Sequence, residues 1–210
     1  MKVEHCTCAD LRAQPVTDAG PVMVLPCTDA AAGRRAAELA ARRAGVDGRL
    51  LVVHDTERVG FVAVVNTAFS CARSPWLGYM AQDAFAGRAW LALALKAMQA
   101  RGAGLLAFND GKWNGQLAAF GLARRSWVDS LYGGSFFFHG YRRHFADAEL
   151  TLIARQAGLL AYEPDSVLVE VDWAKDRAAV DADDRRLFHA RRADGFGGRV
   201  SDPGLLSQVR

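Results

Sequence analysis

The sequence predicts an α/β fold in which a mostly parallel central sheet is flanked by helices. Short apolar, β-branched runs alternate with longer helical stretches up to residue 102, and this alternation is typical of a parallel sheet. The 210 residues contain no linker rich in Pro, Gly or Ser, which predicts a single domain. Ligands of such sheets bind beyond the carboxyl ends of the strands. We therefore expect one site along that edge.

The first half of the chain supplies the clearest elements. Four apolar runs predict strands or extended segments: PVMVLP (21–26), GRLLVVHD (48–55), GFVAVVN (60–66) and WLGYMAQD (76–83). After the turn CTDAAAG, the Ala-rich stretch 34–45 predicts a helix, and the stretch 89–102 predicts another that Gly102 ends. Several of these runs end in polar residues, namely Thr28, Asp29, His54, Asp55, Gln82 and Asp83. These side chains should lie along one edge of the sheet.

The second half changes character. A strand-like opening at residue 104 leads into the Gly-rich turn NDGKWNG, and the stretch ending at Gly158 predicts a helix with Asp147 and Glu149 near its start. The stretch 161–173 predicts a strand that places Glu170 and Asp172 on one face. Residues 1–173 would form the main domain. Residues 174–210, rich in Asp and Arg, would be a tail packed on that domain or a mobile cap.

Charge and cysteine content exclude some classes of protein. A net charge of +3 neither requires nor excludes a polyanionic partner, because Arg is clustered locally; for those clusters a solvated helix face is favoured over phosphate binding. The four cysteines lack the dense spacing of a secreted disulfide framework, which favours a reducing compartment. The sequence has no signal peptide and no apolar run long enough to span a bilayer, so we expect a cytoplasmic location.

Two enzyme classes are poorly supported. The turn after the first strand lacks the glycines of a dinucleotide-binding G-x-G-x-x-G motif. No G-x-S-x-G is present, which argues against a hydrolase triad.

The order of motifs over residues 20–173 resembles the family 2 glycosyltransferases of the GT-A fold, a Rossmann-related α/β fold. The stretches that carry the resemblance are VMVLPCTDA, LLVVHDTE, VAVVNTAFSCA, YMAQDAFAGRAWL, GLLAFNDG and FFFHGYRRHFADAELTLIAR. The resemblance implies transfer of a sugar from a nucleotide-sugar donor, with a UDP-sugar favoured, to an acceptor hydroxyl. The acceptor could be a glycan, a lipid, a protein or a modified base in nucleic acid.

The resemblance also implies roles for individual residues. Asp83 would bind a divalent Mn²⁺ or Mg²⁺ ion that bridges the donor phosphates. Asp147 would be the general base of an inverting transfer, and Glu149 would share the catalytic region. The donor would be held by Pro26, Thr28, Asp29, Asp55, Asn66, Arg73, Gln82, Asp110 and Trp113.

The chain departs from the family pattern at the metal motif. Ala81-Gln82-Asp83 offers one carboxylate where the family usually has two or three, and Gln82 adds an amide oxygen without charge. The late His of the family has no clear match; Glu170 and Asp172 are the candidates to take its place, and His189 is a weaker one. Metal affinity should therefore be low without nucleotide.

Each of these residues also has a structural interpretation. Asp83 could cap the helix that begins near residue 85 or 89, and Asp55 and Asp110 could simply form turns. Asp147 and Glu149 could be favourable first-turn acids, and Trp113 could be packed. The alternative to an enzyme is a GT-A-like module that binds a nucleotide or glycan without turnover.

Overall fold

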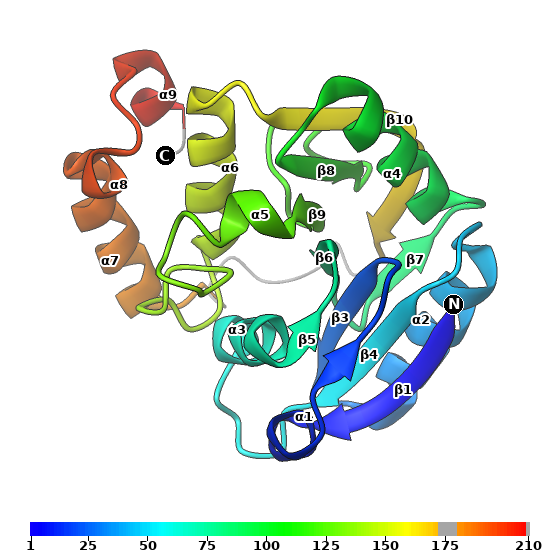
Figure 1. Ribbon diagram of the computed structural model, residues 1–210. Coiled ribbons are helices and arrows are strands. Elements are labelled where there is room, and N and C mark those ends of the chain that lie inside the picture. The colour runs from blue at the N-terminus through cyan, green and yellow to red at the C-terminus, as the bar shows by residue number, and fades with distance from the viewer. Residues whose placement is uncertain (172–179, 209–210) are drawn as a thin grey trace.

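The computed structural model describes residues 1–171 and 180–208, and its centre is an eight-stranded sheet in the order β1-β4-β3-β6-β9-β8-β10-β7 (Figure 1). The strands of this sheet are β1 (Lys2–Thr7), β3 (Val22–Cys27), β4 (Arg49–His54), β6 (Trp76–Tyr79), β7 (Ala84–Ala86), β8 (Leu105–Asn109), β9 (Gly121–Arg124) and β10 (Leu160–Glu170). A separate pair joins β2 (Val16–Thr17) to β5 (Ala72–Arg73). The helices are α1 (Cys8–Ala13), α2 (Ala30–Arg43), α3 (Phe61–Cys71), α4 (Trp90–Arg101), α5 (Arg125–Val128), α6 (Ala146–Gln156), α7 (Ala182–Ala193), α8 (Gly195–Gly198) and α9 (Pro203–Ser207).

Strands β1, β4, β3 and β6 are parallel, so their carboxyl ends meet at one edge of the sheet. The remaining strands are mixed, because β9 runs antiparallel between β6 and β8, and β7 runs antiparallel beside β10. Strand β10 returns to the parallel direction beside β8. The predicted α/β fold, with a central sheet flanked by helices, is confirmed.

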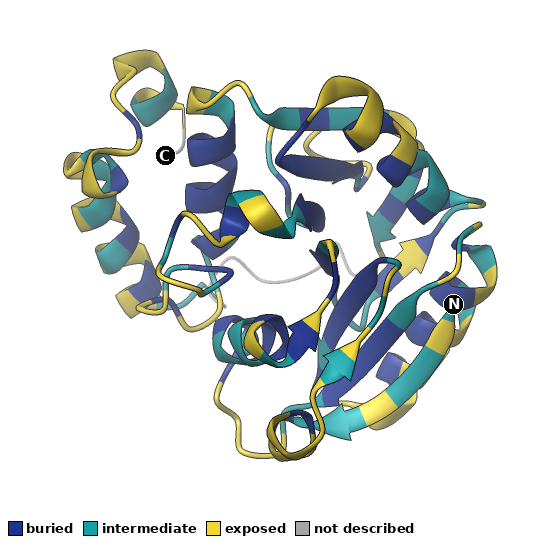
Figure 2. Ribbon diagram, viewed as in Figure 1, coloured by how far each residue is buried: buried dark blue, intermediate teal, exposed yellow. Residues whose placement is uncertain are grey.

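Strand β3 shows why a continuous apolar run was the correct signal. Its residues 22–25 are fully buried although their side chains alternate between the two faces of the sheet. Val22 and Val24 face a core built with α3 and α6, whereas Met23 and Leu25 face a second core built with α2 and α4. Figure 2 shows these buried strands between partly exposed helices.

The segment 60–66, expected to be a strand, is instead the start of helix α3, and that prediction was wrong. Gly60 precedes the helix with φ of +100°, a conformation that favours glycine. Five α3 residues are buried, so the helix is apolar enough to imitate a buried strand in sequence. Helix α2 also begins earlier than expected, at Ala30, because Asp29 caps it.

The described part of the tail packs on the main domain beside α6 (Figure 1). Phe188 of α7 is 1% exposed and stacks on Phe145, with ring centroids 4.9 Å apart. The Arg199 guanidinium donates a hydrogen bond to the carbonyl of Leu131 at 2.6 Å. Within the described residues, no helix has the length and apolar character needed to cross a membrane.

Candidate functional site

A cleft of about 900 Å³ opens at the carboxyl ends of β3, β4 and β6. Five of the residues predicted to bind the donor or a metal line it: Pro26, Thr28, Asp55, Gln82 and Asp83. Pro26 lies near the end of β3, and the other four come from turns that follow β3, β4 and β6. The cleft therefore lies where ligands bind in open α/β sheets.

Gln82 joins the end of β6 to the end of β3. Its side-chain oxygen accepts hydrogen bonds from the backbone N–H groups of Thr28 (3.0 Å) and Asp29 (3.1 Å). Asp29 caps α2, because its carboxylate accepts from the backbone N–H groups of Ala31 and Ala32, and these bonds lower its pKa. Both side chains thus shape the turn at the cleft. The Gln82 oxygen is already used by two donors and adds little to a metal site.

Asp55 organises the loop on the other side of the cleft. Its two carboxylate oxygens accept from the backbone N–H groups of Val59 (2.8 Å) and Gly60 (2.9 Å). Asp55 therefore does form a turn, and the same side chain also lines the cleft. A carboxylate fixed by two backbone donors keeps acceptor capacity for a ligand hydroxyl or base N–H.

Asp83 lies between β6 and β7, and its backbone carbonyl accepts from the N–H of Val171 at 3.1 Å. Helix α4 begins at Trp90 with Ala89 in the cap position, so the interpretation of Asp83 as its N-cap is wrong. Across residues 1–171 and 180–208, no group of three or more His, Cys, Asp or Glu side chains could hold a metal ion. One cleft carboxylate still fits Mg²⁺ or Mn²⁺, since such ions bind through one or two carboxylates together with substrate phosphates.

Basic side chains line the same cleft and were not predicted. Arg35 comes from α2, Arg58 from the loop before α3, and Arg143 and His144 from the segment before α6. The only sequence signal for the last two was the YRRH cluster directly before the late acid pair. The three guanidinium groups bring positive charge to the wall of the cleft.

Asp147 sits in the first turn of α6 and has a strongly perturbed acidity. Burial, followed by the negative charges of Asp110 and Glu170, raises its pKa from 3.8 to about 6, although two backbone N–H groups act in the opposite direction. Its charge in turn adds to the raised pKa of Tyr79, which is due mainly to burial. A carboxylate with a pKa near 6 is suited to accept a proton near neutral pH.

Asp110 forms a turn, which is one of the two interpretations that the sequence allows. It is 3% exposed and accepts from the backbone N–H groups of Lys112 (2.9 Å) and Trp113 (2.8 Å). Trp113 is 40% exposed rather than packed, with the Lys112 ammonium over its ring. Neither residue lines the cleft; Asp110 belongs to the acidic group around Asp147.

Glu149 differs sharply from Asp147. It is fully buried, accepts from the hydroxyls of Tyr132 and Tyr141 (2.9 Å each), and forms a bidentate pair with Arg191 at 2.6 and 2.7 Å. With four donors and no exposed oxygen, it cannot reach a substrate. The structure therefore corrects the catalytic role expected for Glu149, which instead anchors α7 on α6.

Two further predicted donor residues lie away from the cleft. The Asn66 side chain exchanges two hydrogen bonds with the backbone of Phe137, donating at 3.1 Å and accepting at 2.8 Å. Arg73 lies in β5, just before β6 begins, so it is near the amino end of that strand and lines a different hollow with Trp76. These contacts give no support to their expected donor roles, which stay predictions from motif order.

The remaining metal candidates also lie outside the cleft lining. His189 is exposed on α7, with its ring edge against Phe188. Glu170 ends β10 and pairs with Ala84 of β7, one residue from Asp83. Asp172 lies outside the described residues.

Comparison with known proteins identifies a matching family, and several solved structures have a similar fold. The sequence profile of glycosyl transferase family 2 matches residues 21–153. The crystal structure of S. aureus TarS 1-349 has a similar fold, with a TM-score of 0.51 and 10% identity over 71% of this chain. The chain covers 59% of the TarS chain, and a search of curated protein sequences finds no match. These findings confirm the GT-A-like fold that the sequence resemblance implied.

Proposed function

Since the chain belongs to glycosyl transferase family 2, we propose that it transfers a sugar from a nucleoside-diphosphate sugar to an acceptor hydroxyl. The observation that carries this proposal is the cleft itself. It combines Asp55 and Asp83 at two strand ends with a cationic wall, at the edge of the sheet where such folds bind nucleotides.

The donor would lie with its nucleoside near Pro26, Thr28 and Asp55 and its diphosphate toward Asp83. Asp83 would hold a divalent ion together with the donor phosphates. When bound, that ion neutralises charge that builds up on the departing diphosphate. The single carboxylate means that the ion binds weakly until nucleotide is present.

Asp147 would act as the base. It removes the proton of the acceptor hydroxyl while the acceptor oxygen bonds to the anomeric carbon. The bond from that carbon to the phosphate oxygen breaks, and its electron pair leaves with the nucleoside diphosphate. A direct displacement of this kind inverts the anomeric centre. The raised pKa of Asp147 leaves its side chain ionised at neutral pH yet more basic than an ordinary aspartate.

A thermal-shift panel with UDP, GDP, CDP and TDP, each with and without Mn²⁺, tests the donor assignment. A nucleotide at 100 times its dissociation constant should stabilise the native state by about 2.7 kcal/mol, which raises Tm by roughly 5–10 °C in a chain of this size. We expect one nucleotide to do so with Mn²⁺ in the wild type but not in Asp83→Ala.

Asp165→Ala is the matched control, because Asp165 is an exposed acid outside the cleft lining. It should respond as the wild type does. A panel in which no nucleotide changes Tm would contradict the donor cleft. An equal Mn²⁺ effect in Asp83→Ala would contradict the metal assignment alone. Nucleotide binding without sugar transfer to any glycan, lipid, protein or nucleic-acid acceptor would favour a binding module.

A further inference from the structure

The carboxylate of Asp184 holds three consecutive backbone N–H groups. Its oxygens accept from Arg142, Arg143 and His144, each at 2.8 Å, and the residue is 2% exposed. Asp184 lies in the first turn of α7, some 40 residues further along the chain. A buried carboxylate with three such donors strongly fixes the backbone that supplies them.

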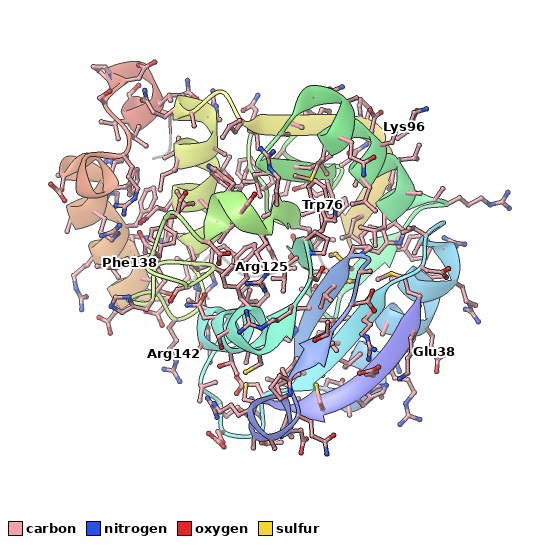
Figure 3. The ribbon with its side chains drawn as sticks, viewed as in Figure 1. Glu38, Trp76, Lys96, Arg125, Phe138 and Arg142 are labelled. Carbon is pink, nitrogen blue, oxygen red and sulfur yellow. The ribbon has the colours of Figure 1, made fainter. Side chains whose placement is uncertain are left out.

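The segment that Asp184 fixes forms part of the cleft wall. Arg143 and His144 both line the cleft, and α6 with Asp147 begins two residues later. The ring nitrogen Nδ1 of His144 also accepts from the backbone N–H of Asp181, just before α7. Figure 3 shows Arg142 on the side of the molecule where α7 lies.

The same segment is tied to the loop on the Asp55 side. The Arg142 guanidinium donates to the carbonyl of Arg58 at 3.1 Å, and the Arg142 carbonyl accepts from the N–H of Val62 at 3.1 Å. Arg58 itself lines the cleft. Helix α7 therefore fixes the segment before α6 that forms this wall of the cleft. The hydrogen bonds of Arg142 connect that segment to the loop that contains Arg58.

We propose that Arg143 and His144 bind the diphosphate of the donor and that Asp184 is the positioning residue that holds them in place. This inference rests on the proposed donor cleft and adds a phosphate site formed by the Arg143 guanidinium and the remaining ring N–H of His144. A guanidinium fork matches phosphate oxygens in geometry and charge. Among the described cleft residues, Asp83 is the carboxylate proposed to hold the metal, so basic side chains such as Arg143 would meet much of the diphosphate charge.

Binding of UDP and of uridine, measured by calorimetry, separates phosphate contacts from nucleoside contacts. If the thermal-shift panel selects another base, its diphosphate and nucleoside replace them. Arg143→Gln and Asp184→Asn should each weaken diphosphate binding about tenfold and leave nucleoside binding unchanged, since each loses a charge-assisted contact or its alignment. The wild-type affinity for the diphosphate should also fall more steeply with salt than that of Arg143→Gln.

Two matched controls remove a like charge without touching the cleft. Arg42→Gln alters an exposed arginine of α2, and Asp183→Asn alters the exposed acid next to Asp184, which pairs with Arg186. Both should bind the diphosphate as the wild type does. Because Asp184→Asn could unfold the chain, its melting curve is recorded first; Arg143→Gln changes an exposed side chain and tests the proposal independently.

The outcomes are distinct. Wild-type diphosphate binding with no loss in Arg143→Gln would overturn the inference and leave the proposed function intact. Equal losses of diphosphate and nucleoside binding in a folded Asp184→Asn would overturn its positioning role, because general loosening of the fold would explain them. Failure of the wild type to bind any nucleotide would overturn both the function and this inference.

Discussion

Replacing Asp147 by Asn should stabilise the protein while removing its proposed base. Burial and two neighbouring carboxylates raise the pKa of Asp147 from 3.8 to about 6. Each pH unit is worth about 1.4 kcal/mol, so ionising this side chain at neutral pH destabilises the fold by up to about 3 kcal/mol. Asp147 is partly exposed, and solvent reduces the effect below that limit.

The direction of the pH dependence follows from the raised pKa. Between about pH 4 and 6 the folded chain binds more protons at Asp147 than the unfolded chain, so this residue makes wild-type stability fall as pH rises through that window. Above pH 6 the penalty is complete. Asn carries no charge at any pH, so the variant avoids it.

Urea unfolding at pH 4 and pH 8 measures this difference. Asp147→Asn should exceed the wild type by up to about 3 kcal/mol at pH 8, or roughly 6–12 °C in Tm, and match it near pH 4. Asp165→Asn, at an exposed acid, should follow the wild type at both pH values. A variant that is less stable at pH 8, or whose advantage is the same at pH 4, would refute the reasoning.

Other substitutions test structural roles seen away from the base. Arg191→Met leaves the buried Glu149 carboxylate without its ion pair and should destabilise the fold by about 3–5 kcal/mol in urea unfolding, whereas adding Glu149→Gln should recover part of that loss. Asn66→Ala strips both hydrogen bonds from the Phe137 backbone and should lower stability by about 2 kcal/mol without changing nucleotide affinity; selective loss of nucleotide binding would restore Asn66 to the donor site. Gln82→Ala frees the turn after β3 and should weaken nucleotide binding severalfold in calorimetry, and unchanged affinity would show that the turn holds without it.

The parallel part of the sheet was predictable because its strands are buried on both faces. Such strands read as continuous apolar runs; β4 falls within one predicted run, and β3 matches another to within one residue. Helix α3 was misread because it too is largely buried, so its apolar Val-rich start lacks a helical period. The loop before it is fixed by Asp55, which accepts from the Val59 and Gly60 N–H groups four and five residues along the chain, a local contact that apolar patterning does not reveal.

The candidate site also has residues that the sequence could place and residues that it could not. Strand-end residues such as Asp55 and Asp83 could be placed at one edge from the sequence, because parallel strands bring their carboxyl ends together. The buried ion pair of Glu149 could not be predicted from the sequence, because its partner Arg191 lies 42 residues away in the tail. Asp184 gave no signal for the same reason: its role exists only once α7 packs beside the segment before α6.

Release of nucleoside diphosphate from a panel of nucleotide sugars, compared between the wild type and Asp147→Asn, tests the central claim most directly. Water or an added acceptor can take the sugar, and the product is measured by mass spectrometry. We predict that the wild type turns over one donor and that Asp147→Asn binds that donor equally well but releases product at least about 100-fold more slowly. Equal rates in the two proteins would contradict Asp147 as the base and, with it, the mechanism proposed for this cleft.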